Sequence, residues 1–147
     1  MTGYTKIVKE INRFVTKFRK RSLPALEIGQ LYDLSPEKGN SKKQAKLKWP
    51  DDWANSDRAG VYIFFNEDLN ILYIGKASMY NSLGYRLSDY FRYNRKTKRC
   101  KIKHSNWSEP PRYVLTVAVP TDMSFEAPAL EEYLITKTQP KDNDRGI

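Results

Sequence analysis

Two apolar runs of β-forming residues, separated by five mostly polar residues, constrain the fold of this chain more than any other feature. The runs cover residues 60–65 and 71–75, and the pattern predicts an antiparallel β-hairpin. With a four-residue loop at 66–69, Tyr62 faces Tyr73 across the hairpin, so that two phenols share one face of the sheet. From the pattern alone, the simpler interpretation is that these tyrosines pack beneath a helix.

Helical periodicity predicts three helices, and a further apolar run predicts a third strand. The helices cover residues 4–20, 81–91 and 124–138, and the strand covers residues 113–119. Residues 35–58 are rich in Pro, Gly, Ser, Asn, Asp and Lys, which is typical of a loop. The element order predicts an α/β fold in which a small three-stranded sheet is flanked by helices.

The first predicted helix, at residues 4–20, is amphipathic. Ile7, Ile11 and Phe14 share one side, and lysines and an arginine occupy the other. We expect a surface helix that docks through its apolar side. A partner-binding helix and a membrane-surface helix are the alternatives.

The charge of the chain limits its possible partners. The chain has 26 Lys and Arg residues against 17 Asp and Glu residues, which gives a formal net charge of +9 and a pI near 9.6. This excess suits a polyanion, either nucleic acid or an anionic membrane surface.

The sequence also indicates a cellular location. No apolar run reaches the roughly 18 residues that a membrane span needs, and the charged N-terminus lacks the apolar middle segment of a signal peptide. Cys100 is the only cysteine, which excludes an internal disulfide and a cysteine metal cluster. We therefore expect a cytoplasmic protein.

The predicted helix at 81–91 carries two polar groups one turn apart. Arg86 and Tyr90 lie on one side of this helix, bordering its apolar stripe. An arginine at such an edge buries its stem and delivers its guanidinium into a cleft beside the sheet. An ordinary solvated arginine is the alternative.

The last predicted helix places a carboxylate among apolar side chains. Glu131 falls in the middle of the stripe formed by Ala127, Leu130 and Leu134, whereas Glu132 points to solvent. A core-facing carboxylate is costly unless it pairs with a cation or binds a metal ion. The position favours a functional role, and a structural salt bridge, for instance with Arg86, is the alternative.

A strongly basic segment follows the helix that carries Arg86. The solvated surface loop is the commoner meaning of such a run, but its place beside Arg86 favours contacts to phosphates, which position a nucleic acid without reading its sequence. The candidate nucleic-acid-binding residues are Arg92, Arg95, Lys96, Lys98, Arg99, Lys101 and Lys103.

In these positions the chain resembles the GIY-YIG nuclease family. The two tripeptides of the family correspond to Gly60-Val61-Tyr62 and Tyr73-Ile74-Gly75. The resemblance covers residues 59–143, and implies a nuclease domain at 59–147 preceded by a helix and a basic loop at 1–58. The residues that match the family's functional positions are Tyr62, Tyr73, Lys76, Arg86, Tyr90, Glu131 and Asn143.

The chain departs from the family pattern in a few places. Val61 replaces the usual Ile, and the segments from Lys76 to Arg86 and from Arg86 to Glu131 are longer than in the repair-nuclease branch. His104 is either an ordinary surface histidine or the counterpart of a histidine in the homing-endonuclease branch.

The resemblance implies a metal-dependent endonuclease that hydrolyses DNA phosphodiester bonds, with RNA left open as a substrate. Tyr62 would be the general base, and Lys76 would be the cation that lowers its pKa. Tyr73 would hold water or a phosphate oxygen, and Arg86 would grip the phosphate. Glu131 would bind one Mg²⁺ or Mn²⁺ ion, and Asn143 would orient the glutamate or the phosphate.

Two other classes of function compete with this reading. One is a nucleic-acid-binding module of the same fold with little or no catalytic activity, and the other is a membrane-surface protein that uses the first helix. The catalytic residues favour the nuclease, so we expect DNA and no membrane as partner. Targeting would come from residues 1–58, from a protein partner or from the structure of the DNA.

Overall fold

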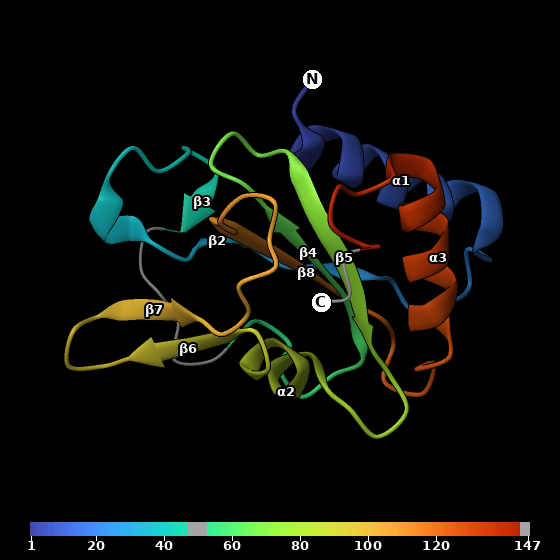
Figure 1. Cartoon of the computed structure of the whole chain (residues 1–147). Coiled ribbons are helices and arrows are strands. Elements are labelled where there is room, and N and C mark those ends of the chain that lie inside the picture. Colours follow the sequence, from blue (N-terminus) through green and yellow to red (C-terminus); the bar gives the residue numbers. More distant parts are fainter. Residues whose placement is uncertain (47–52, 145–147) are drawn as a thin grey trace.

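The computed structural model describes residues 1–46 and 53–144 (Figure 1). The helices are α1 (Gly3–Phe18), the 3-10 helix η1 (Pro36–Lys38), α2 (Leu83–Ser88) and α3 (Glu126–Thr138). The strands are β1 (Glu27–Ile28), β2 (Leu31–Asp33), β3 (Ala45–Lys46), β4 (Gly60–Phe65), β5 (Ile71–Ala77), β6 (Phe91–Asn94), β7 (Arg99–Ile102) and β8 (Tyr113–Ala118).

The main sheet follows the order β3-β2-β8-β4-β5, with β1 also paired to β8. Among the pairings of the described residues in this sheet, only β2–β3 is parallel. The central strands β4 and β8 are buried along their whole length, and β5 forms one edge. The predicted three-stranded sheet was therefore too small, because β1, β2 and β3 have only two or three residues each and show no periodicity.

The hairpin register differs from the predicted one by two residues. Tyr62 pairs with Gly75 and Phe64 pairs with Tyr73, and the register shifts at Phe65. The loop has five residues rather than four, because the Asn66 side chain accepts hydrogen bonds from the Asp68 and Asn70 amides. A two-residue offset keeps the same sheet face, so Tyr62 and Tyr73 still stack as diagonal neighbours, with ring centroids 6.4 Å apart.

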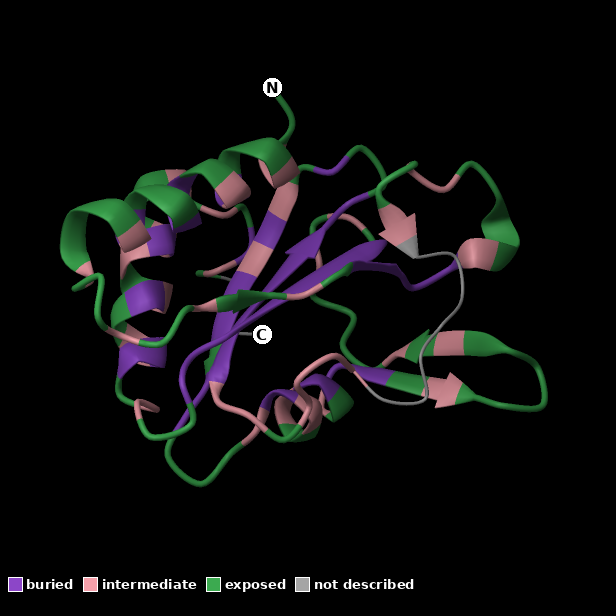
Figure 2. Cartoon of the chain, turned by 180° about the vertical axis from the view of Figure 1, so that it is seen from behind, coloured by how far each residue is buried: buried purple, intermediate pink, exposed green. Residues whose placement is uncertain are grey.

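Helices α1 and α3 cover one face of the sheet. Ile7 and Ile11 of α1 join Leu130 and Leu134 of α3 in one buried cluster, and Figure 2 shows the buried sides of both helices turned toward the sheet. At the end of α1, Arg19 binds the Glu126 carboxylate of α3 with two hydrogen bonds of 2.6 and 3.1 Å. The helix α1 is thus a surface helix that docks on the protein through its apolar side.

The other face is covered by α2 and by a small second sheet. The predicted helix at 81–91 is shorter in the structure, since α2 ends at Ser88 and Phe91 begins β6. The basic segment is not a loop but the hairpin β6–β7, which turns where the Asn94 side chain accepts hydrogen bonds from the Lys96 and Thr97 amides. None of the helices in the described parts of the chain has the length and apolarity needed to cross a bilayer.

Candidate active site

A pocket of about 220 Å³ opens at the edge strand β5. It collects five of the seven predicted catalytic residues, while Tyr90 and Asn143 lie next to it. The residues that line the pocket are Tyr62, Tyr73, Gly75, Lys76, Ser78, Asn81, Arg86 and Glu131. Ser78 and Asn81 were not predicted, and the only sequence signal for them is their place in the loop directly after Lys76.

The pocket receives side chains from both faces of the sheet. Alternate residues of a strand point to opposite faces, so Tyr73 and Gly75 lie on the α2 side with Tyr62. Lys76 lies on the α3 side, where its charge acts on Glu131. Only an edge strand allows one pocket to be lined from both faces of the sheet, because a central strand would separate Tyr62 from Lys76 and Glu131.

Gly75 allows Tyr62 to approach the strand closely. A Cβ atom at position 75 would overlap the ring and hydroxyl of Tyr62. The Tyr62 ring is 1% exposed and lies across Gly75 in the paired register. The glycine of the second tripeptide is thus required by the tyrosine of the first.

Three phenols meet beneath the pocket. The hydroxyls of Tyr62 and Tyr90 are 3.2 Å apart, and the Tyr73 and Tyr90 rings are 6.0 Å apart. Burial raises the pKa of all three, for Tyr90 to about 12. At Tyr62, the hydrogen bond with Tyr90 and the charge of Arg86 both oppose this rise in pKa. At Tyr73, the hydrogen bond with Tyr90 raises the pKa further. The charge of Arg86 lowers the pKa of all three phenols, and the hydrogen bond with Tyr90 favours Tyr62 over Tyr73 as the phenolate.

The cation beside Tyr62 is Arg86. Its guanidinium lies 6.0 Å from the centre of the Tyr90 ring and forms an ion pair of 3.0 Å with Asp89. Lys76 was the expected cation, but its ammonium donates to the Ser78 hydroxyl at 3.4 Å, and its charge lowers the pKa of Glu131. Arg86 therefore has the effect on Tyr62 that was expected of Lys76.

Glu131 is the one acidic side chain among the described residues that line the pocket. It is half-buried, and burial raises its pKa against the opposing charge of Lys76, whereas Glu132 is exposed. Within the described residues Glu131 forms no hydrogen bond or ion pair, and Arg86 binds Asp89 instead of Glu131. The structural salt bridge with Arg86 is thus not formed.

The Glu131 carboxylate fits a hard divalent ion. Its oxygens are ligands that Mg²⁺ and Mn²⁺ prefer, and a bound cation would compensate the charge that burial disfavours. No group of three or more His, Cys, Asp or Glu side chains that could hold a metal ion occurs in the described residues. An ion held by Glu131 would therefore keep most of its coordination positions for water and phosphate oxygens.

Asn143 acts on the strand rather than on Glu131. Its side-chain oxygen accepts a hydrogen bond from the Ile74 amide at 2.9 Å, and its side-chain nitrogen donates to the Ile74 carbonyl at 2.8 Å. Asp142 also donates its amide to the Leu72 carbonyl at 2.7 Å. These contacts fix β5 between Tyr73 and Gly75, and the expected role of orienting the glutamate or the phosphate stays a prediction.

The β6–β7 hairpin lies next to α2 (Figure 1), and exposed basic side chains lie along it and on the residue after it. Arg92 pairs with Lys101 across the hairpin, so two cations lie side by side. Apolar Phe91 and Ile102 turn inward to the second core cluster. All seven predicted nucleic-acid-binding side chains are exposed: Arg92, Arg95, Lys96, Lys98, Arg99, Lys101 and Lys103.

His104 lies at the margin of the phenol group. The ring is exposed and stands at 62° to the Tyr90 ring, with centroids 5.5 Å apart. Trp107, which the sequence did not single out, packs edge-on against Tyr73 at 5.8 Å. Both residues follow the basic hairpin and help to cover Tyr90.

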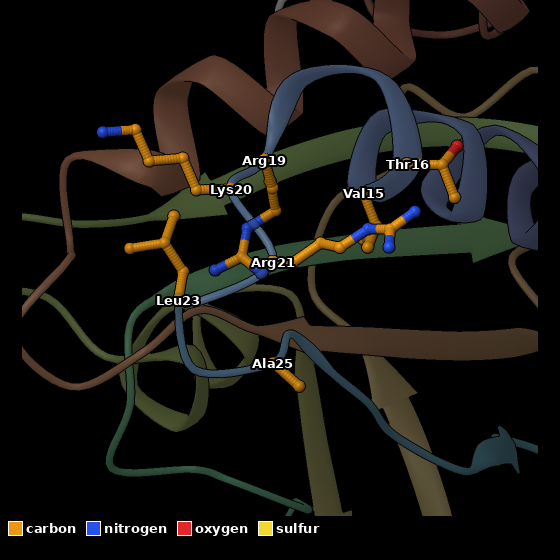
Figure 3. A pocket seen from close by; sticks show the side chains of 7 residues that line it. All are labelled: Val15, Thr16, Arg19, Lys20, Arg21, Leu23 and Ala25. Carbon is orange, nitrogen blue, oxygen red and sulfur yellow. The ribbon is translucent and has the colours of Figure 1, made fainter.

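A second pocket, of about 300 Å³, lies at the end of α1 (Figure 3). It holds Arg19, Lys20 and Arg21, but its described lining has no carboxylate, phenol or imidazole. Arg19 is bound to Glu126 and to the Pro24 carbonyl. This pocket contains no group that could act as a base, whereas the pocket at β5 brings Tyr62, Arg86 and Glu131 together and is the candidate active site.

Comparison with known proteins identifies the family of the segment that contains this pocket. The model of the UvrC-like GIY-YIG domain matches residues 58–143. The UvrABC system protein C of Methanosphaera stadtmanae is 36% identical over 102 residues, which cover 67% of this chain and 15% of that protein. No solved structure matches the chain. Since the matched segment holds the whole sequence from Gly60 to Asn143, the chain belongs to the GIY-YIG nuclease family.

Proposed function

We propose that this protein is an endonuclease that hydrolyses DNA phosphodiester bonds with the help of one divalent cation. The observation that carries the proposal is the convergence of Tyr62, Arg86 and Glu131 on one pocket from three different elements. A buried phenol, a guanidinium and a half-buried carboxylate together supply a base, an anion-binding group and a metal ligand. A module that only binds nucleic acid has no need of this set.

Tyr62 is the general base in this proposal. Its phenolate accepts the proton of the attacking water, and the Tyr90 hydroxyl stabilises the phenolate by donating a hydrogen bond across the 3.2 Å contact. Tyr73, stacked beside Tyr62, positions the water or a phosphate oxygen. Arg86 binds the scissile phosphate and stabilises the charge that develops during attack.

Glu131 would hold the divalent cation, which would supply positive charge to polarise the phosphate and stabilise the leaving oxygen. Lys76, on the same side of β5, moderates the charge of Glu131. Asn143 keeps β5 in place and is a positioning residue. The basic hairpin β6–β7 contacts the DNA backbone on the side of Arg86, which makes binding dependent on salt.

The relative named above is a component of the UvrABC system, which agrees with DNA as the substrate class. The direct test is incubation of supercoiled plasmid with the protein and Mn²⁺, with and without a chelator. We expect nicking that the chelator abolishes and that the Tyr62→Phe variant lacks. Binding without nicking by the wild type would instead support the non-catalytic binding module.

A further inference from the structure

Three large, exposed side chains surround one pocket next to the active site. Met79 is 81% exposed, Tyr80 is fully exposed and Tyr85 is 62% exposed. All three line a pocket of about 480 Å³, together with polar residues that include Arg58 and Ser82. Exposed aromatic and apolar side chains that gather in this way mark binding sites.

The 480 Å³ pocket adjoins the active site. Asn81 lines both pockets. Ser78 of the active site directly precedes Met79 and Tyr80, and Arg86 directly follows Tyr85. If Arg86 binds a phosphate, the neighbouring nucleotide would lie near the pocket that holds the two tyrosines.

The turn that carries Tyr80 has an unusual backbone. Met79 has φ of 61°, in the left-handed region that residues other than glycine rarely adopt. The Asn81 amide closes the turn by donating to the Ser78 carbonyl at 3.2 Å. In Figure 1 the chain between β5 and α2 extends away from the sheet. The fold thus presents Tyr80 to solvent rather than packing its ring.

We propose that Tyr80 and Tyr85 form a stacking platform for an unpaired base next to the scissile phosphate. This inference rests on the proposed nuclease function and names its substrate class. An aromatic ring stacks on any of the four bases, because each base has a π face. A base inside a duplex already stacks on its neighbours, so the platform favours DNA with an unpaired nucleotide at the cleavage site, as in a flap, a bubble or a single strand.

The test measures binding without catalysis, in the presence of a chelator. DNA with one unpaired 2-aminopurine beside a junction is compared with a fully paired duplex of the same sequence. We expect the wild type to quench the 2-aminopurine fluorescence and to bind the unpaired DNA more tightly. Tyr80→Ala and Tyr85→Ala should each weaken that binding roughly 5- to 100-fold, with little change for the duplex.

Two variants serve as controls. Tyr80→Phe keeps the ring and should retain both quenching and affinity. Phe18→Ala removes an aromatic side chain at the end of α1 that is 65% exposed and lines neither the active site nor the 480 Å³ pocket. This variant should change neither the quenching nor the affinity. Because Tyr80 is fully exposed, its substitution should leave the melting temperature close to that of the wild type.

The outcomes separate this inference from the proposed function. If the wild type and Tyr80→Ala bind unpaired and duplex DNA equally well, the platform is wrong, whether or not the protein cuts DNA. If the wild type quenches and prefers unpaired DNA but cuts no DNA with Mn²⁺, the platform stands and the nuclease proposal fails.

Discussion

The side chain of Asn143 forms two hydrogen bonds with the main chain of Ile74, one accepted at 2.9 Å and one donated at 2.8 Å. Ile74 lies between Tyr73 and Gly75, which line the active-site pocket. A residue near the end of the chain thus completes the edge of the strand that carries the site. These two hydrogen bonds take the place of those that a neighbouring strand would form with Ile74.

The first prediction follows from this contact. Asn143→Ala leaves the Ile74 amide and carbonyl without these partners, which should cost about 1–3 kcal/mol of stability. The turnover number should fall while the affinity for DNA changes little, since Asn143 holds the strand and does not line the pocket. Single-turnover cleavage, DNA titration and thermal melting check this.

Lys141→Ala is the matched control for Asn143→Ala. Lys141 forms only an exposed ion pair of 3.0 Å with Glu109, and such pairs contribute about 0–1 kcal/mol. Equal losses of activity in both variants would show that the contact with Ile74 has no special role.

The second prediction concerns two adjacent glutamates. Glu131→Ala should abolish metal-dependent cleavage, and Glu132→Ala should change it little, because only Glu131 lines the pocket. Without metal, the melting temperature of Glu131→Ala at pH 7 should equal or exceed that of the wild type, since a partly buried carboxylate without an ion-pair partner disfavours folding. A destabilised Glu131→Ala that still cleaves DNA would contradict the metal-binding role.

The third prediction is a pH profile. Burial raises the pKa of Tyr62, so the phenolate is the minor form near neutral pH and its population grows about tenfold with each pH unit. The logarithm of the cleavage rate should therefore rise with a slope near one between about pH 6 and 9. Tyr62→Phe should lose about 10²- to 10⁴-fold in rate, and a wild-type rate that levels off below pH 8 would point to another base.

The fourth prediction uses the hydrogen bond between two phenols. Tyr90→Phe removes the hydrogen bond that lowers the pKa of Tyr62. A higher pKa means less phenolate at any given pH, so the rate should fall across the whole profile while the slope is preserved. Unchanged rates in Tyr90→Phe would mean that this contact does not tune the base.

The fifth prediction tests the basic hairpin. Replacing Arg95, Lys96, Lys98 and Arg99 together with Ala should weaken duplex binding and flatten the plot of log affinity against log salt. The control removes four lysines of and just after α1: Lys6, Lys9, Lys17 and Lys20. If both quadruple variants flatten the plot equally, net charge rather than the hairpin position accounts for binding.

Much of the site could be predicted from the sequence, because its residues obey strong local rules. Glu131 stood out because a carboxylate among apolar helix positions needs an explanation, and the structure places it in the pocket. Arg86 and Tyr90 stood out by their helical spacing, although Tyr90 lies just beyond α2. The helical pattern ran on to Phe91 because that residue also faces the core, from β6.

The remaining features depend on contacts between distant residues. The very short strands β1 and β2 both pair with β8, which lies far from them in the sequence. The hairpin register depends on the side-chain hydrogen bonds of Asn66, which no pattern of alternation reveals. The group on which each cation acts also depends on the fold. Lys76 points to the sheet face opposite Tyr62, so its charge acts on Glu131, and the charge that acts on Tyr62 is that of Arg86.

An edge strand at the active site has a further consequence. Unpaired main-chain groups on a sheet edge are a template on which the strand of another molecule adds, and this leads to aggregation. The contacts from Asp142 and Asn143 occupy the Leu72 and Ile74 positions of that edge. These contacts should therefore also protect the protein against self-association through β5, the strand that lines the candidate active site.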